Sequence, residues 1–534
     1  MSLGTTPVRD NEQDRPEQLP ADPAAPGMTG VKLRIWSIVS RVGASLPAGT
    51  RRELLPVVVV AAVLRFVDLG AVGLNSDEAV YAGQAASLAN NPHFSALFPI
   101  VRAHPLLMQI TMSWLYARGI PDTPGRYVAA LFGVGTVALV YLLGRILYDR
   151  RVATIGALLL AVMPYHVVVS RQIMLDGPMA FFATGALVCL AVAGTKPARA
   201  RWLVAAGACL GLAALTKETG IIFIGGAFVF LSLVNHLWRP LRFPLAGLAV
   251  ALMLAFSYPI LTAVSGGSHG GQSYLLWQLT RQPNHSFTFY ATAVGASMGV
   301  GLLALSALGL VPRLSGRRLT WRETLLLSWI VAPLMFFEIW PVKGFSYLEP
   351  MAPVVAVLAA RALSPLPGVL LKGWRRIALS GLTVAAVASV AIAAVVGIAN
   401  PVSSGLAGAG GLPGGREVGQ WVDTHVPQGA RLMTIGPSMA NIIQYYSGRR
   451  SDGLSVSPNP LHRNPTYHPI TNADAALKAG DYQYIVWDQW SASRSPHFAA
   501  TALTLMRRFG GYAIHEQPGS SPGHPAVVIY EVSP

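Results

Sequence analysis

Charged residues are scarce in this chain of 534 residues, because Asp, Glu, Lys and Arg together make up only 12% of it. Hydrophobic residues account for 52%, and the mean hydropathy is +0.47. So few charges cannot cover the surface of a large folded protein, which excludes an ordinary soluble globular chain. The composition indicates a polytopic membrane protein with an additional region outside the membrane.

Cysteine and acidic residues are also rare. The two cysteines, Cys189 and Cys209, both lie in apolar stretches, which excludes a disulfide framework and a cysteine-based metal site. Residues 54–399 carry 24 basic and 10 acidic residues, whereas residues 400–534 carry 9 and 8. The basic excess therefore belongs to the apolar part. This distribution is typical of the positive-inside bias of membrane proteins, and we expect no nucleic-acid partner.

Long apolar segments recur after residue 53, and most have the roughly 17–25 residues needed to cross a bilayer core of about 30 Å. They lie near residues 54–70, 127–147, 152–169, 178–194, 202–216, 219–236, 244–263, 289–311, 324–341, 348–366 and 377–399. We therefore predict a polytopic α-helical membrane protein with about eleven transmembrane helices. We expect the protein to lie in the lipid bilayer of the plasma membrane.

Charge also predicts the topology. Residues 1–53 are expected to be a disordered, basic N-terminus in the cytoplasm, because five basic residues and no acid lie between Lys32 and Arg52. Basic residues recur in alternate connections, and most acids lie in the others. If the apolar stretch from His104 to Arg118 crossed the membrane, this pattern would reverse. We predict a helix along the outer surface there, within a long first outer loop at residues 71–126.

The end of the chain is less apolar. A Gly-rich linker is predicted at residues 400–415, followed by a small soluble α/β domain at residues 416–534 on the extracytoplasmic side. Strands are predicted at 431–435, 483–487 and 525–531, and helices at 415–425, 437–446 and 497–509, from the change in hydrophobic period.

Two adjacent carboxylates, Asp77 and Glu78, follow the first apolar segment. Asn75 precedes Glu78 by three residues, as in a helix capping pair, so one interpretation is that both acids only stabilise the first turn of a helix. Ionisable groups beside a hydrocarbon boundary are costly and usually functional. We therefore treat both acids as candidate catalytic residues.

Further charged residues are predicted on the same side. Arg171 and Asp176 lie five residues apart, a spacing that also suits a pair that fixes the depth of a helix in the membrane. Lys217 is followed by Glu218, which could equally be a solvated turn. Cations from four connections nevertheless gather on the side of the acids, which favours an anionic phosphate ligand. These cations are Arg102, His104, Arg171, Lys217 and Lys343.

The order of several short motifs resembles a known family. These motifs are NSDEAVYAGQAASL, RAHPLL, SRQIMLDGPMAFFAT, LAALTKETG and KGFSYLEPMAPVVAVLAARAL, within residues 54–366. They resemble the GT-C class of polyprenyl-phosphate-sugar-dependent glycosyltransferases, in the branch of protein-O-mannosyltransferases and aminoarabinose transferases. Two positions depart from the family pattern. Val80 stands where many relatives carry a basic residue, and Leu106 replaces a second proline.

The resemblance implies a role for each candidate residue. Asp77 would be the catalytic base with Glu78 in support, and Asp176, Tyr81 and Tyr347 would line the acceptor cavity. The donor phosphate would lie near His104, with Arg102, Arg171, Lys217 and Lys343 as further contacts. A divalent metal ion held by Asp77 and Asp176 is compatible with this chemistry, but no spacing in the sequence requires one.

We therefore expect transfer of a sugar, with inversion, from a polyprenyl-phosphate-linked donor to a hydroxyl group on the extracytoplasmic face. The acceptor would be a protein, a glycolipid or a cell-wall glycan. A phosphate leaves as a stabilised anion, so the site needs a base and cations rather than a strong general acid. The alternatives are a transporter or flippase of anionic lipids, for which the sequence lacks an internal repeat, and a scaffold whose C-terminal domain binds a partner.

Overall fold

The computed structural model describes residues 48–100, 104–117, 124–195, 199–234, 240–264, 280–281, 283–314, 320–364, 373–399, 412–464, 467–521 and 524–533. By their contacts, Pro56–Pro534 group into one unit. The predictions for residues 1–47, for Arg102 and for most of the linker at 400–415 lie outside the described residues.

Each of the predicted apolar segments contains helix. The helices are α2 (Ala48–Phe66), α6 (Pro124–Leu147), α7 (Arg150–Val162), α8 (Pro164–Val169), α9 (Asp176–Thr195), α10 (Arg199–Thr216), η1 (Glu218–Ile221), α11 (Ile222–Leu233), α12 (Arg242–Val264), α14 (Phe289–Met298), α15 (Val300–Leu314), α16 (Trp321–Ile339), η3 (Phe345–Met351), α17 (Ala352–Ala362) and α18 (Trp374–Ala399). In the described part of the chain, α6, α9, α12 and α18 are long and apolar enough to cross a membrane. The crossing number of about eleven stays a prediction.

Two of the predicted spans are interrupted at residues that explain the break. Met163 is extended between α7 and α8, because the following Pro164 disfavours helical backbone at the residue before it. Gly299, with φ 85°, lies between α14 and α15, which meet at 95°. Glycine adopts this backbone conformation without a steric penalty. If α14 and α15 form one span, the described chain has a fifth candidate.

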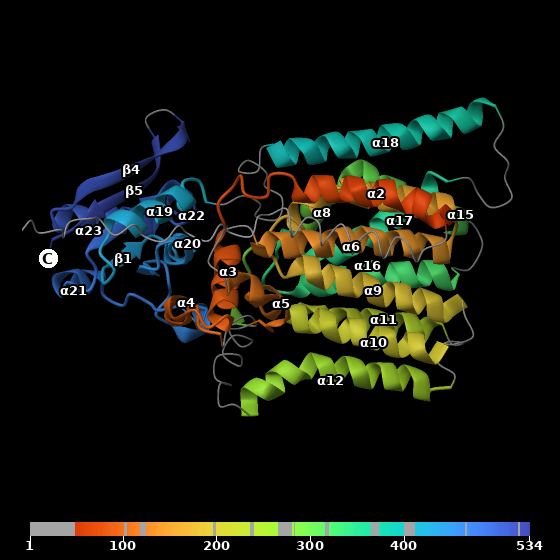
Figure 1. Cartoon of the computed structure of the whole chain (residues 1–534), viewed down its shortest axis with the longest axis horizontal. Helices are drawn as coiled ribbons and strands as arrows, with labels where there is room; N and C mark the ends of the chain where they lie inside the picture. The colour runs from red at the N-terminus through yellow and green to blue at the C-terminus, as the bar shows by residue number, and fades with distance from the viewer. Residues whose placement is uncertain are drawn as a thin grey trace, which may run out of the picture. The chain divides into compact units, whose positions relative to one another are not determined.

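Figure 1 shows the apolar helices as a bundle in which α9 packs against α6 and α10, and α10 packs against α12. The α10–α12 contact is a backbone contact. A Cβ atom on Gly207 would lie 2.0 Å from the carbonyl oxygen of Gly247, and a Cβ on Gly247 would lie 2.5 Å from that of Leu203. Small residues at such crossings allow membrane helices to approach closely, which makes this bundle dense.

Residues 71–126, which the sequence predicts as the first outer loop and which keep that name here, contain three short helices, α3 (Ser76–Leu88), α4 (Pro92–Leu97) and α5 (Leu107–Tyr116). The predicted helix within His104–Arg118 is therefore confirmed as α5. With 10 residues it extends about 15 Å, which is too short to cross a membrane. It packs against α3 and α6. That it lies along the membrane surface stays a prediction.

Residues 412–533, here called the C-terminal region, contain a five-stranded sheet in the order β2-β1-β3-β5-β4. The β1 strand pairs in parallel with β2 and β3, and β5 pairs antiparallel with β3 and β4. The elements are α19 (Gly415–His425), β1 (Arg431–Thr434), α20 (Pro437–Ser447), β2 (Arg450–Gly453), η5 (Pro460–His462), α21 (Ala473–Lys478), β3 (Tyr484–Asp488), α22 (Gln489–Arg494), α23 (Pro496–Arg508), β4 (Tyr512–Ser521) and β5 (His524–Glu531).

The three strands predicted from the sequence correspond to β1, β3 and β5, and the predicted helices correspond to α19, α20 and α23. The strands β2 and β4 were not predicted from the sequence. Arg450–Gly453 has no β-branched or aromatic residue, and Tyr512–Ser521 includes a proline and a glycine, which are depleted in strands. Pairing with neighbouring strands makes these segments extended.

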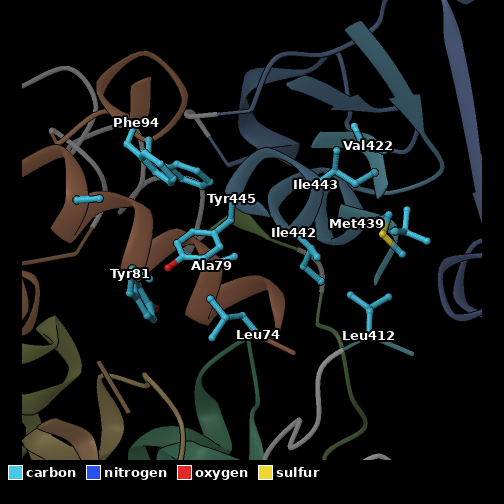
Figure 2. Packing of buried hydrophobic residues seen from close by; sticks show 14 of the residues in the cluster. Leu74, Ala79, Tyr81, Phe94, Leu412, Val422, Met439, Ile442, Ile443 and Tyr445 are labelled. Carbon is cyan, nitrogen blue, oxygen red and sulfur yellow. The ribbon is translucent and has the colours of Figure 1, made fainter. Parts of the chain in front are cut away.

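One hydrophobic core joins the first outer loop to the C-terminal region. Figure 2 shows Tyr445 of α20 close to Ala79 and Tyr81 of α3, with Phe94 of α4 beside them. The rings of Phe94 and Tyr445 meet edge to face with centroids 5.6 Å apart. The C-terminal region is therefore packed on the loop that carries Asp77 and Glu78.

Candidate active site

The start of α3 positions the two adjacent acids. Asn75 is the N-cap residue: its side chain accepts a hydrogen bond from the Glu78 amide, and the Glu78 carboxylate accepts one from the Asn75 amide. The predicted capping pair is therefore confirmed. It fixes the first turn of α3, in which Asp77 and Glu78 are neighbours on different faces.

Glu78 is buried and bound on several sides. Arg126 at the start of α6 donates two hydrogen bonds to its carboxylate, each 2.7 Å long, and the amide of Ile173 donates a third at 2.9 Å. Arg126 also donates to the carbonyl groups of Leu69, Val72 and Gly73. Both side chains of this ion pair are at most 5% exposed. The pair ties α3, α6 and the preceding loop together.

Asp77 differs from Glu78 because solvent reaches its side chain. Within the described residues, no group donates a hydrogen bond to its carboxylate. Surrounding protein nevertheless displaces much of the water, and this partial burial raises the pKa of Asp77, while His104 and Lys217 oppose the rise. Asp77 is thus an accessible carboxylate that binds a proton more readily than an ordinary aspartate.

Asp176 and Lys217 form a buried ion pair beside Asp77. The Lys217 Nζ atom lies 2.8 and 3.0 Å from the two carboxylate oxygens of Asp176. Burial alone would lower the pKa of Lys217, but Asp176, Tyr347 and Glu218 together outweigh it and the pKa is raised. Lys217 also lies over the ring of Tyr347, 4.4 Å from its centroid. Burial raises the pKa of the Tyr347 hydroxyl.

A second ion pair joins the first outer loop to the helix after α10. The Nδ1 atom of His104 lies 2.7 Å from the Glu218 carboxylate, and both side chains are partly exposed. Burial would raise the pKa of Glu218, but His104, Lys217 and a backbone hydrogen bond together more than compensate and the pKa is lowered. Tyr81 meets the imidazole edge to face, with centroids 6.0 Å apart. The fold thus brings Tyr81, His104, Asp176, Lys217 and Tyr347 around Asp77.

Two other predicted phosphate contacts make different interactions. Arg171 donates hydrogen bonds to the carbonyl groups of Leu64, Val67 and Asp68, at the end of α2. Lys343 forms an ion pair of 3.1 Å with Glu338. Their role in phosphate binding stays a prediction.

The donor set does not fit a metal ion. Both oxygens of Asp176 bind Lys217, and the described residues contain no group of three acidic, histidine or cysteine side chains arranged to hold a metal. Coordination by Asp77 and Asp176 therefore has no support from the geometry of the described residues.

A buried polar group among the helices was not predicted from the sequence. Arg65 of α2 donates to Nδ1 of His166 at 2.7 Å, which leaves the imidazole proton on Nε2 if the ring is neutral. That Nε2 atom lies 4.0 Å from the fully buried carboxylate of Glu349, which has no hydrogen-bond partner in the described part of the chain. Each of these residues lies inside an apolar segment, where a single polar residue indicates function only weakly.

The C-terminal region also holds the segment before Asp77. Arg416 donates to the carbonyl of Val72 at 2.8 Å, and the Tyr446 hydroxyl accepts a hydrogen bond from the Leu74 amide at 2.9 Å. Asn441 donates to the Ser76 hydroxyl at 3.0 Å. The sequence contains no signal for these contacts, because more than 340 residues separate the partners.

Comparison with known proteins adds to this geometry. Residues 103–262 match the sequence model of the family described as dolichyl-phosphate-mannose-protein mannosyltransferase. No curated protein matches the chain in sequence. The structure is similar to ArnT from Cupriavidus metallidurans bound to undecaprenyl phosphate, with a TM-score of 0.66 and 18% identity over 89% of this chain and 97% of that chain.

A more distant likeness extends to AglB, the oligosaccharyltransferase of Archaeoglobus fulgidus, with a TM-score of 0.56 and 15% identity over 90% of this chain and 74% of that chain. For the arabinofuranosyltransferase AftD from Mycobacteria, the TM-score is 0.51 and the identity 16%, over 91% of this chain and 40% of that chain. The chain has the GT-C fold. The family-model match includes His104, Asp176 and Lys217 of this chain but begins after Asp77, so only the similarity of fold covers the first acid.

Proposed function

We propose that this protein is an integral membrane glycosyltransferase that transfers a sugar from a polyprenyl-phosphate-linked donor to a hydroxyl acceptor on the extracytoplasmic face. The GT-C fold supports the class of enzyme. The ArnT structure contains undecaprenyl phosphate, and the AglB structure contains a dolichol-phosphate, which supports this class of donor.

The state of Asp77 carries the proposal. The neighbouring acids Glu78, Asp176 and Glu218 are each bound to a basic side chain, whereas the carboxylate of Asp77 accepts no hydrogen bond from the described residues and is open to solvent. A general base must be able to approach the proton that it removes. Asp77 meets this requirement, and its raised pKa strengthens it as a base.

Each bond in the reaction can be assigned. The acceptor hydroxyl gives its proton to a carboxylate oxygen of Asp77 as its own oxygen attacks the anomeric carbon of the donor sugar. The bond from that carbon to the phosphate oxygen breaks, and the polyprenyl phosphate leaves with the electron pair. Attack opposite to the leaving group inverts the anomeric configuration. Lys217 and His104, whose charges act on Asp77, would stabilise the phosphate anion.

Glu78 would act through Asp77 as a positioning residue, because its carboxylate binds Arg126 and the Ile173 amide. The positive-inside pattern supports an outer location for this site. Basic residues such as Arg145, Arg150 and Arg151 lie at the opposite ends of α6 and α7 from the loop that carries Asp77.

The test uses the full-length protein in lipid nanodiscs with radiolabelled polyprenyl-phosphate sugars. Asp77→Asn should abolish transfer to the acceptor, a loss of at least about 100-fold, because general-base catalysis contributes about that much or more. Asp68→Asn is the matched control, since Asp68 lies near the end of α2 and outside the cluster. Wild-type transfer by Asp77→Asn would contradict the assignment. Lipid movement across vesicles without sugar transfer would favour a flippase.

A further inference from the structure

A polar cavity of about 90 Å³ lies where the first outer loop meets the C-terminal region. Leu97, the last residue of α4, and Pro99 form one wall. Asn441 and Gln444 of α20 form another, and Tyr467 and His468 complete it. The cavity therefore lies against the same interface that holds the segment before Asp77.

Several hydrogen-bonding groups of this cavity are not used within the described protein. The amide nitrogen of Asn441, a residue only 2% exposed, donates to the hydroxyl groups of Ser76 and Tyr467 at 3.0 and 3.2 Å. Its Oδ1 atom accepts no hydrogen bond from the described residues. The side chain of Gln444 makes none with them either. The Oδ1 atom of Asn441 and the side-chain amide of Gln444 can therefore form hydrogen bonds with a ligand that enters the cavity.

The side-chain amides of the lining favour a ligand with many hydroxyl groups. Side-chain amides both donate and accept hydrogen bonds, as hydroxyl groups do. At the edge of the cavity, Arg431 and Arg450 share the carboxylate of Asp452, at 3.0 and 3.7 Å. Apolar atoms of Leu97 and Pro99 suit the less polar face of a sugar ring.

The position of Asn441 connects this cavity to the reaction. Its amide bonds Ser76, which directly precedes Asp77 in the first turn of α3. We propose that the cavity binds one sugar residue of a glycan acceptor and thereby places the reacting hydroxyl near Asp77. This inference rests on the proposed function and adds the acceptor class to it.

A peptide acceptor fits this surface less well. Extended peptides bind to sheets by pairing with an exposed edge strand. The edge strand beside the cavity is β2, in which Ser451, Asp452 and Gly453 are buried. The backbone of β2 is thus covered on this side, and recognition must come from side chains.

The experiment measures transfer by the full-length protein in nanodiscs with its radiolabelled donor and two probe acceptors, short neutral oligosaccharides and a Ser/Thr-containing peptide. Gln444→Ala removes one amide from the cavity. We expect it to raise KM for the oligosaccharide about 3- to 10-fold, as the loss of one neutral hydrogen bond does, with KM for the donor unchanged. Gln420→Ala on the exposed face of α19 is the matched control and should have wild-type constants.

Two results would overturn the acceptor subsite while the proposed function stands: a wild-type oligosaccharide KM in Gln444→Ala, or a wild-type enzyme that glycosylates the peptide and no oligosaccharide. Donor consumption is measured separately, as release of labelled sugar to water. A wild-type protein that neither transfers nor hydrolyses the donor would overturn the proposed function itself, and the acceptor subsite with it.

Discussion

Removing one hydroxyl group from the C-terminal region should slow sugar transfer at Asp77. The Tyr446 hydroxyl accepts a hydrogen bond of 2.9 Å from the amide of Leu74, a residue only 1% exposed. In Tyr446→Phe this buried N–H loses its acceptor, which costs about 1–3 kcal/mol. Arg126 and Arg416 still hold the segment, so it should shift rather than unfold.

The size of the effect on the reaction follows from this cost. If the segment before Asp77 moves so that the Leu74 amide finds another partner, the fraction of molecules with Asp77 in its wild-type position falls about 5- to 150-fold, since 1.4 kcal/mol corresponds to a factor of ten. The expected result for Tyr446→Phe is a fall in kcat within this range, with KM for the donor unchanged. Hydrogen exchange of a peptide that covers residues 72–78 should become faster.

Tyr512→Phe is the matched control for this experiment. Tyr512 donates its hydroxyl proton to Glu531 on the exposed face of β4 and β5, so its loss should change neither kcat nor exchange at residues 72–78. A Tyr446→Phe variant with wild-type kcat and wild-type protection of residues 72–78 would refute the reasoning. The C-terminal region would then pack on the loop without controlling the position of its acid.

Three further predictions concern charges near the site. Lys217 lowers the pKa of Asp77, and Asp176 raises it. In the pH profile of kcat/KM, measured on the residual activity, the acid limb should therefore move to higher pH in Lys217→Met and to lower pH in Asp176→Asn. Shifts of the same sign in both variants would contradict this. Arg126→Met leaves Glu78 buried without its cation, which should lower the free energy of unfolding by about 3–5 kcal/mol and lower the Tm. Adding Glu78→Gln to this variant should restore part of the lost Tm. Burial raises the pKa of Asp77 in the folded chain. This group therefore stabilises the folded chain at pH values below its pKa in the unfolded chain, about 4, and this stabilisation is lost as the pH rises through the pKa in the folded chain. Asp77→Asn should therefore have a Tm at or above that of the wild type at pH 7 and an equal one near pH 4, whereas a much lower Tm at pH 7 would indicate a structural role.

The helices and the cap of α3 could be predicted from the sequence because both depend on nearby residues. Apolar runs such as 127–147 and 178–194 correspond to α6 and α9 within a few residues, and Asn75 and Glu78 cap α3 three residues apart. The ends of these helices also carry the polar side chains, so Asp77, Asp176 and Lys217 could be selected as candidates. Local spacing did not indicate which cation binds which acid.

The roles of the arginines show why those pairings needed the fold. Arg171 is a predicted phosphate contact because it is one of the cations on the side of the acids, yet it binds carbonyl groups at the end of α2, more than 100 residues earlier. Arg126 was not selected, although it binds Glu78 across 48 residues. An arginine donates hydrogen bonds to whichever acceptors the packed helices bring to it, and their identity depends on three-dimensional proximity.

The sequence by itself determined that the chain is a membrane protein, where its apolar helices lie, and that Asp77 and Glu78 begin a capped helix after the first of them. These properties follow from composition, run length and contacts within one helical turn. The tertiary structure decided that Glu78 is bound by Arg126 while Asp77 remains open, and that Asn441, Tyr446 and Arg416 hold the segment before it. Those differences arise from contacts between residues tens to hundreds of positions apart, which packing creates and local patterns do not record.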